Sequence, residues 1–203
     1  MKKPTDTKER IEEIALDLFS KCGYKAVSIR DICKELGFTE SSIYYHFKNK
    51  QAIMDALLEK VEVLIDNKSA NFDAAFEKAK TVTEEEMGKV AVGVLVTYLL
   101  NPYVFKIISV LTLERMSDPK AYETYERIVF TRPLTQQEKA FRQMIDRGFI
   151  RPNNPTVLAE QYYAIIYFAF QKNCIGAELD EAVIAKTAKE IEENIRDFFR
   201  KLK

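Results

Sequence analysis

The chain has 203 residues, of which 47% are hydrophobic and 31% are charged, a balance typical of a soluble globular protein. This composition excludes a disordered or fibrous chain. The 31 Lys and Arg residues balance 31 Asp and Glu residues, so the formal net charge is zero. A neutral chain has no overall field that attracts nucleic acid or an anionic membrane, and composition alone therefore argues against DNA binding.

Only six Gly and six Pro are present, which leaves little material for tight turns and predicts an all-α fold. We expect capping boxes at three helix starts: Asp6 and Thr7 with Glu9, Ser28 with Asp31, and Thr83 with Glu86. Helices are predicted at about 7–22, 28–36, 40–46, 50–67, 70–80, 84–100, 102–116, 119–147 with a break near Pro133, 155–175 and 181–202. Left-handed glycines are expected to close helices at Gly23, Gly37, Gly148 and Gly176.

The cysteines and the apolar segments indicate where the protein works. Cys22, Cys33 and Cys174 are odd in number and lack CxxC spacing, so we expect a reducing cytoplasm, no disulfide and no metal site. The most apolar run, residues 90–100, makes a helix of about 16 Å, whereas a bilayer core needs about 30 Å. We therefore expect no membrane span, and a helix that is enclosed on all sides because it is apolar around its whole circumference.

The first three predicted helices have the outline of a helix-turn-helix. In residues 7–22 an apolar stripe runs along one face, leaving Lys8, Glu12, Glu13 and Asp17 to solvent. A second short helix ends at Gly37, which permits a sharp turn, and Thr39 then caps a third helix whose apolar contacts are Ile43 and Phe47. The outline by itself is unspecific, because helical hairpins with a glycine turn occur in many helical proteins.

The third helix carries more hydrogen-bonding groups than solubility requires. Hydroxyls, imidazole and ammonium groups occupy most of residues 40–50, and no acidic residue occurs from Ser41 to Met54. Such groups meet phosphate oxygens and base edges. The alternative is a polar face that is merely solvated, which would leave the adjacent Tyr44 and Tyr45 exposed without purpose.

Several segments together resemble the DNA-binding domain of the TetR family of bacterial repressors over about residues 7–53. They are Ala15–Phe19, Gly23-Tyr24, Ser28–Cys33, Leu36-Gly37 and Ser42–Lys50. The resemblance implies a three-helix DNA-binding domain at 1–50 and a larger helical domain for ligand binding and dimerisation at 51–203. It further implies a set of DNA-binding residues: Ser28, Arg30, Thr39, Glu40, Ser41, Ser42, Tyr44, Tyr45, His46, Lys48 and Lys50.

Two members of this set need comment. Phosphates repel the Glu40 carboxylate, so it should either accept from a cytosine amino group or turn away. His46 is the only histidine of the chain, so catalytic His dyads and His-rich metal sites lack a second member, and we expect no enzyme and no cofactor. Its position between Tyr45 and Phe47 favours a phosphate contact.

Residues 51–203 offer two further candidate sets, each of which could equally be plain core. Buried phenols need hydrogen-bond partners, and a small, largely apolar effector could supply one. The ligand-binding candidates are Tyr98, Tyr103, Phe105, Phe130, Phe141, Tyr163, Tyr167 and Phe168. The resemblance implies that the last two helices form a homodimer interface, with the candidates Leu158, Tyr162, Ile165, Ala169, Ile184, Ile191, Ile195 and Phe198.

These observations predict a cytoplasmic, homodimeric transcriptional repressor that binds a palindromic operator in double-stranded DNA and is released by an effector. The alternative is a helical small-molecule-binding or scaffold protein without DNA binding, which would have no reason to keep the Tyr44–Lys50 cluster. The neutral composition remains compatible with DNA binding, because the local placement of charged residues decides whether a surface attracts phosphates. Residues 1–50 hold 10 basic and 8 acidic side chains, and we expect a focused patch that contacts a few phosphates.

Overall fold

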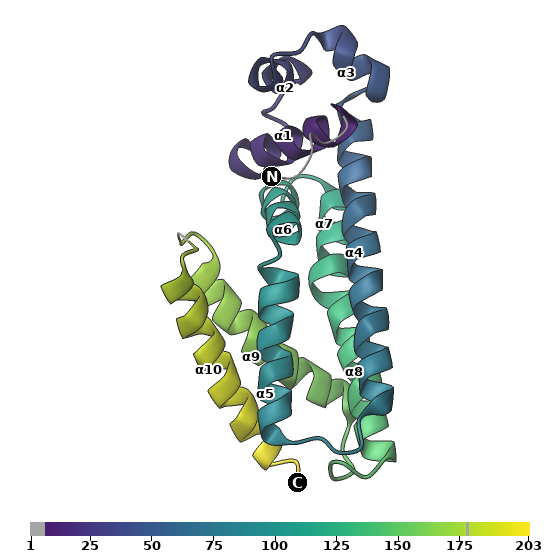
Figure 1. Cartoon of the computed structure of the whole chain (residues 1–203), viewed down its shortest axis with the longest axis vertical. Helices are drawn as coiled ribbons and strands as arrows, with labels where there is room; N and C mark the ends of the chain where they lie inside the picture. The colour runs from purple at the N-terminus through teal and green to yellow at the C-terminus, as the bar shows by residue number, and fades with distance from the viewer. Residues whose placement is uncertain (1–6, 178) are drawn as a thin grey trace. The chain divides into compact units, whose positions relative to one another are not determined.

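The computed structural model describes residues 7–177 and 179–203, and the regular elements within these ranges are all helical, which confirms the all-α fold (Figure 1). They are α1 (Thr7–Cys22), α2 (Ile29–Leu36), α3 (Glu40–His46), α4 (Lys50–Lys78), α5 (Glu84–Val94), the π-helix η1 (Leu95–Leu99), α6 (Pro102–Glu114), α7 (Pro119–Glu126), the π-helix η2 (Arg127–Thr131), α8 (Arg132–Asp146), α9 (Pro155–Cys174) and α10 (Glu181–Arg200).

Local signals set most helix ends. The Ser28 hydroxyl accepts the Asp31 N–H at 3.2 Å while the Asp31 carboxylate accepts the Ser28 N–H at 2.7 Å. The same reciprocal pair joins Thr83 and Glu86. These two capping boxes satisfy N–H groups of the first turn that have no partner within the helix. The box predicted at the start of the first helix includes Asp6, which lies outside the described residues. The four glycines predicted to close helices all have positive φ, between 68° and 85°.

The largest difference from the predicted helices lies in α4, which runs unbroken from Lys50 to Lys78 where two helices were expected at 50–67 and 70–80. The expected gap falls at Lys68 and Ser69, and neither Gly nor Pro occurs there to end a helix. Without a residue that ends a helix at this position, α4 continues through the predicted gap.

The expected break near Pro133 takes the form of η2 immediately before α8. Proline has no N–H, so the Val129 carbonyl lacks an α-helical donor and the Ile128 carbonyl lacks a π-helical one. Two buried tyrosines replace these donors: the Tyr98 phenol donates to Ile128 O at 2.6 Å and the Tyr163 phenol to Val129 O at 2.7 Å.

The described residues divide into two compact units. The first contains the residues up to Asn67 together with Pro102–Glu126, and the second contains Lys68–Asn101 and Arg127–Lys203. The first unit thus holds α1–α3, the beginning of α4, α6 and α7, and is larger than the predicted domain 1–50. The difference arises because α6 packs against α1, although 80 residues separate Cys22 from Pro102 in the sequence.

The first unit has a core built from the apolar faces predicted for residues 7–50. Ile11, Phe19, Ile32 and Ile43 are fully buried, and Leu57 of α4 joins them. Full burial of a side chain of this size contributes about 1.5–3 kcal/mol relative to its exposure. This core fixes the placement of the two short helices α2 and α3, which could not be stable alone.

Two acidic residues of α1 are not left to solvent as predicted. Glu12 is 2% exposed and forms an ion pair with Lys60 of α4, and the half-buried Asp17 forms one with Lys106 of α6. Glu12 is thus paired with α4 and Asp17 with α6. A helical pattern assigns polar residues to solvent by default, and these tertiary partners are remote in sequence.

The second unit consists of the end of α4, α5, η1, η2 and α8–α10, and α10 packs on both α5 and α9. A ring cluster joins α8, α9 and α10, with centroids 5.4–6.5 Å apart among Phe141, Tyr162, Phe198 and Phe199. Residues 90–100 were expected to be enclosed on all sides. This expectation is wrong, because Val96 is 44% exposed.

Among residues 7–177 and 179–203, no single helix is long and apolar enough to cross a membrane. Two consecutive helical stretches, Glu84–Leu99 and Pro102–Glu114, reach that length and apolarity only when they are taken together across the break at Leu100 and Asn101.

Candidate nucleic-acid interface

A helix-turn-helix is formed by α2 and α3. The turn begins at Gly37, whose left-handed φ of 68° would strain any other residue. The Phe38 N–H donates to Cys33 O at 3.0 Å and closes the end of α2. Thr39 then starts α3, because its hydroxyl accepts the N–H of Ser42 at 3.4 Å. Two short helices are thereby joined by a two-residue turn and a cap.

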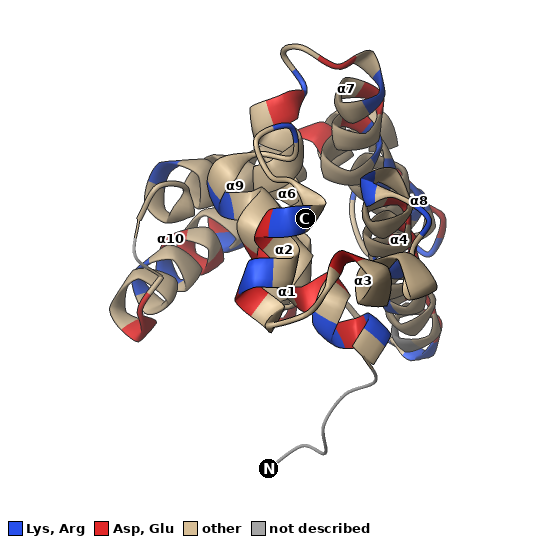
Figure 2. Ribbon diagram, turned by 90° about the horizontal axis from the view of Figure 1, so that it is seen from above, with Lys and Arg blue, Asp and Glu red and all other residues tan. Residues whose placement is uncertain are grey.

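One face of α3 is anchored and the other is open. Ile43 is fully buried and Phe47, at the end of the helix, is 4% exposed. On the open side, Tyr45 is 86% and Tyr44 49% exposed. Apart from Glu40 at its start, the α3 ribbon carries no Asp, Glu, Lys or Arg (Figure 2). This uncharged face, which is rich in hydroxyl groups, suits contact with base edges. The phosphates of DNA would repel a face rich in carboxylates.

The predicted Glu40 has a partner within the protein. Its carboxylate accepts from Arg30 Nε at 2.8 Å, with the Arg30 side chain exposed and the Glu40 side chain half-buried. This hydrogen bond, with the charge of Glu40, raises the pKa of Arg30. Of the two expected roles, turning away from DNA phosphates is the one that this ion pair favours. Arg30 keeps its terminal nitrogens for other contacts, because only Nε is used in the pair.

The predicted hydroxyl residues sit at helix starts. Ser28 donates to the Asp31 carboxylate at 2.6 Å, and hydrogen bonds from Ser28 lower the pKa of Asp31. The hydroxyls of Thr39 and Ser42 lie 3.0 Å apart and share a hydrogen bond. All three residues are exposed. A hydroxyl that donates one bond can still accept from or donate to a second group, so each remains able to contact a phosphate or base.

Lys50, one of the DNA-binding residues that the resemblance implied, has hydrogen-bond partners within the protein. It is half-buried, and its ammonium group donates to the backbone oxygens of Tyr24 and Val27, each at 2.7 Å. The ammonium also lies 4.3 Å from the centre of the Tyr24 ring. Burial lowers the pKa of Lys50. Two of its three N–H donors therefore hold the turn between α1 and α2, whereas Lys48 is exposed.

Comparison with known proteins supports this geometry. The family model of the bacterial regulatory proteins of the TetR family matches residues 11–57. The HTH-type transcriptional regulator AcrR of Shigella flexneri is 34% identical over 71 residues, which make up 35% of this chain and 33% of AcrR. Over residues 11–57, the chain matches the TetR family. The matched region spans about a third of the length of the curated relatives.

The TetR-family fold extends over nearly the whole chain. A TetR-family protein of Mesorhizobium loti MAFF303099 is 16% identical with a TM-score of 0.75, and the match covers 95% of both chains. A protein of Saccharomonospora viridis, described as a transcriptional regulator and solved in complex with choline, is 23% identical with a TM-score of 0.64, again over 95% of both chains. At these identities the likeness establishes the fold.

Two basic residues of α1 that lie beside α3 were not among the DNA-binding residues predicted from the sequence. Lys8 Nζ lies 5.5 Å from the ring centre of Phe47, where α3 ends, and the Arg10 guanidinium lies 5.2 Å from that of Phe38, just before α3 begins. Both residues are exposed. The apolar stripe of α1 already placed them on its open side, but only the packing shows that this side borders both ends of the recognition helix.

The predicted ligand-binding residues are distributed over both units. Tyr103 and Phe105 belong to the first unit, and the other six belong to the second. Within the second unit the phenols of Tyr98 and Tyr163 are already bound to backbone oxygens of η2. The rings of Phe130 and Tyr167 pack edge to face at 5.2 Å.

Two of the ligand-binding candidates differ in their exposure. Phe168 is 64% exposed on α9. Phe141 is 1% exposed and packs in the ring cluster with Tyr162 and Phe199. A depression of about 410 Å³ in the second unit is lined by Glu77, Gln143, Asp146 and Arg147, none of which was predicted.

The predicted dimer residues lie on two sides of their helices. Five of them are at most 2% exposed and pack inside the second unit: Leu158, Tyr162, Ala169, Ile191 and Ile195. They are corrected to core residues, because a side chain already buried in its own chain adds no area to an interface. Ile165, Ile184 and Phe198 are half-buried. The accessible face of α9 instead carries Val157 and Phe168, which are 41% and 64% exposed.

Within the two described ranges, no group of three or more His, Cys, Asp or Glu side chains is arranged to hold a metal ion. The described residues also include no bonded cysteine pair, since Cys22, Cys33 and Cys174 are all free thiols.

Proposed function

We propose that this TetR-family chain is a transcriptional repressor that acts in the cytoplasm as a homodimer. It binds a palindromic operator through α2 and α3, and a small, largely apolar effector releases it. The observation that carries the proposal is the open face of α3, where Tyr45 is 86% exposed beside Tyr44, Ser41 and Ser42 while Ile43 anchors the opposite face.

In this proposal α3 enters the major groove, as the second helix of a helix-turn-helix does. Ser41 and Ser42 at its start meet base edges, Tyr44 and Tyr45 meet bases or the backbone, and Arg30 reaches a neighbouring base. Lys8 and Arg10 add phosphate contacts at the two ends of the helix, in place of Lys50, which supports the turn. The contacts with bases provide specificity, and those with phosphates set the register.

The second part of the proposal is that two chains pair as a homodimer. One seven-residue recognition helix covers few base pairs, and a two-fold dimer reads two half-sites about 34–36 Å, or a multiple of this, apart. The α9 face with Val157, Ile165 and Phe168 has the apolar spacing of a helix-pairing surface, because these residues follow one side of the helix. A monomeric mass at micromolar concentration would contradict the homodimer.

Effector release requires that the ligand bind one conformation better than another. An effector that prefers a form with wrongly spaced recognition helices shifts the population away from the operator-binding form. The choline-bound relative makes small cations with apolar groups a rational first class to screen. The second unit, with its aromatic residues, is the proposed receptor for such a compound.

The decisive test measures fluorescence anisotropy with an operator duplex selected from a random library. Tyr45→Ala should weaken binding by about tenfold, which corresponds to about 1.4 kcal/mol, since it removes the most exposed contact of α3. Tyr122→Ala is the matched control, because Tyr122 of α7 is also exposed, at 51%, but lies outside the helix-turn-helix. It should leave the affinity unchanged.

A wild-type chain that selects no duplex would favour the other function, a helical small-molecule-binding or scaffold protein without DNA binding. Equal affinities of wild type and Tyr45→Ala would also contradict the assigned face. We propose no enzymatic activity for this chain.

A further inference from the structure

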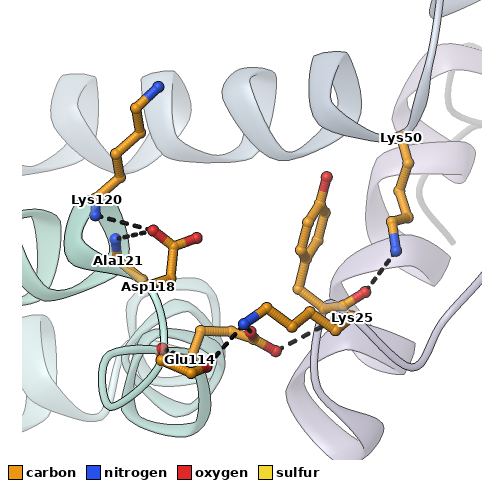
Figure 3. A network of polar contacts seen from close by, with 8 residues as sticks. Lys25, Lys50, Glu114, Asp118, Lys120 and Ala121 are labelled. Carbon is orange, nitrogen blue, oxygen red and sulfur yellow. Dashed lines mark hydrogen bonds and ion pairs between the residues drawn. The ribbon is translucent and has the colours of Figure 1, made fainter.

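The turn between α1 and α2, residues 23–27, is held from two sides by helices that follow much later in the sequence (Figure 3). Lys50, the first residue of α4, donates to the carbonyl oxygens of Tyr24 and Val27. Glu114, the last residue of α6, accepts the backbone N–H of Lys25 at 3.3 Å. Carbonyl and N–H groups of one short turn are thus occupied by side chains of opposite charge.

Glu114 is an unusual residue for such a place, because its side chain is buried, with the whole residue 7% exposed. A buried carboxylate is costly unless it is paired and hydrogen-bonded. Its second oxygen lies 3.6 Å from Lys25 Nζ, and that ammonium also donates to Ser117 at 2.7 Å. The carboxylate therefore contacts one residue of the turn through both its backbone and its side chain.

The turn is shaped to receive the carboxylate. Gly23 has a φ of 85°, and a Cβ atom at this position would lie 3.3 Å from Glu114 Oε1. Both the backbone conformation and the close approach therefore favour glycine. Replacement of Glu114 would leave the Lys25 N–H without its carboxylate acceptor, and a polar group stripped of its partner in a semi-buried turn drives the backbone to rearrange.

Helix α6 also contacts α1 at a second point, nearer the start of α6. Lys106 of α6 forms an ion pair with Asp17 of α1, and eight residues, or about 12 Å of helix, separate Lys106 from Glu114. A displacement of α6 along its axis therefore acts on α1 and on the turn together. The turn leads directly into Ser28, the cap of α2, so its position sets where α2 and α3 begin.

We propose that Glu114 is a positioning residue for DNA binding, which makes the orientation of the recognition helix depend on α6. The proposal rests on the DNA-binding function given above and deepens it, since α6 lies outside the matched residues 11–57. By holding residues 23–27, the carboxylate keeps α2 and α3 in the binding-competent orientation. Loss of the carboxylate lowers the populated fraction of that orientation, and the apparent affinity falls by the same factor.

Simple electrostatics predicts the opposite result, which makes the test sharp. Removal of a negative charge reduces repulsion from phosphates and should strengthen DNA binding. If Glu114 positions the turn, Glu114→Ala instead weakens binding to the selected operator duplex by about tenfold or more. Glu114→Gln keeps an oxygen that can accept the Lys25 N–H, so it should recover part of this loss. Glu123→Gln, an exposed carboxylate of α7 in the same unit, is the matched control and should not weaken binding.

Hydrogen–deuterium exchange of the free proteins supplies a readout independent of DNA. In Glu114→Ala the amides of residues 23–27 and of α2 should exchange at least tenfold faster, while those of α9 keep wild-type protection and show that the chain is folded. Wild-type affinity together with wild-type exchange in Glu114→Ala overturns the proposal, and so does faster exchange with unchanged affinity. Loss of protection in α9 as well makes Glu114 a general stabilising residue and also overturns it.

Failure of the underlying function has a different signature. A wild-type protein that binds no selected duplex refutes the DNA-binding function, and the role of Glu114 in DNA binding with it. Exchange of residues 23–27 in Glu114→Ala still reports in that case whether the carboxylate holds the turn.

Discussion

Two adjacent tyrosines of α9 show that the hydrogen bonding of a buried hydroxyl depends on its immediate surroundings. Tyr163 donates to Val129 O at 2.7 Å, whereas the Tyr162 hydroxyl is buried without a hydrogen-bond partner among the described residues. Tyr162 is fully buried against the rings of Phe141, Phe198 and Phe199. Burial in this apolar cluster raises the pKa of the Tyr162 phenol.

The Tyr162 hydroxyl is a source of instability that substitution can remove. Tyr162→Phe deletes an unsatisfied group and keeps the ring, so we expect the free energy of unfolding to rise by about 1 kcal/mol. Urea denaturation followed by circular dichroism measures this change. Tyr163→Phe is the matched substitution of opposite sign. It leaves Val129 O without its donor and should lower the free energy of unfolding by about 1–2 kcal/mol. Equal effects of the two substitutions would show that at least one of the two hydroxyls is not in its assigned state.

At the scale of elements, η2 shows a helix interrupted by a missing donor and repaired from neighbouring elements. Pro133 has no N–H to donate to the Val129 carbonyl in an α-helix or to the Ile128 carbonyl in a π-helix. The phenols of Tyr163 and Tyr98 donate to these two oxygens instead. The tyrosines were predicted as ligand contacts because a buried phenol needs a partner. That reasoning was correct about the need, but the partner of each is the backbone of η2.

This account predicts that Pro133 and Tyr163 are energetically coupled. Pro133→Ala restores an N–H that can reach Val129 O, so Tyr163→Phe should cost about 1 kcal/mol less in that background than in wild type. The four unfolding free energies of a double-mutant cycle give the coupling directly. Pro119→Ala at the start of α7 is the control, since a first helical residue needs no donor. Coupling of the same size with Pro119→Ala would refute the explanation.

The elements that the sequence predicts well are those with signals inside a few residues. The capping box of Ser28, the left-handed Gly37 and the cap at Thr39 placed α2 and α3 within one residue of their observed bounds. The burial of Glu12 and the carbonyl contacts of Lys50 were not predictable in this way. Their partners lie 48 and 23–26 residues away, and a helical pattern shows that a face is polar without showing what packs on it.

For the whole molecule, a net charge of zero restricts how DNA can be bound. Only local cations are available, and those bordering α3 are few: Lys8 and Arg10 from α1, Arg30 from α2, and Lys48 after the helix. Of these, Arg30 is paired with Glu40. Non-specific affinity, which depends on phosphate neutralisation, should therefore be weak, and the hydroxyl-rich face of α3 should provide most of the discrimination among sequences.

The salt dependence of operator binding tests this view of the whole protein. Each phosphate contact contributes about 0.9 to the slope of log affinity against log salt concentration. Lys8→Gln and Arg10→Gln should each reduce the magnitude of that slope by about 1.8 for a homodimer, because each removes one contact per subunit. Titrations by fluorescence anisotropy between 50 and 200 mM salt, on the order of the range where such slopes are read, give the value. Lys186→Gln on α10 removes the same charge from the other unit and should leave the slope unchanged. A slope insensitive to both α1 substitutions would place the phosphate contacts elsewhere and leave Lys8 and Arg10 as packing partners of Phe47 and Phe38.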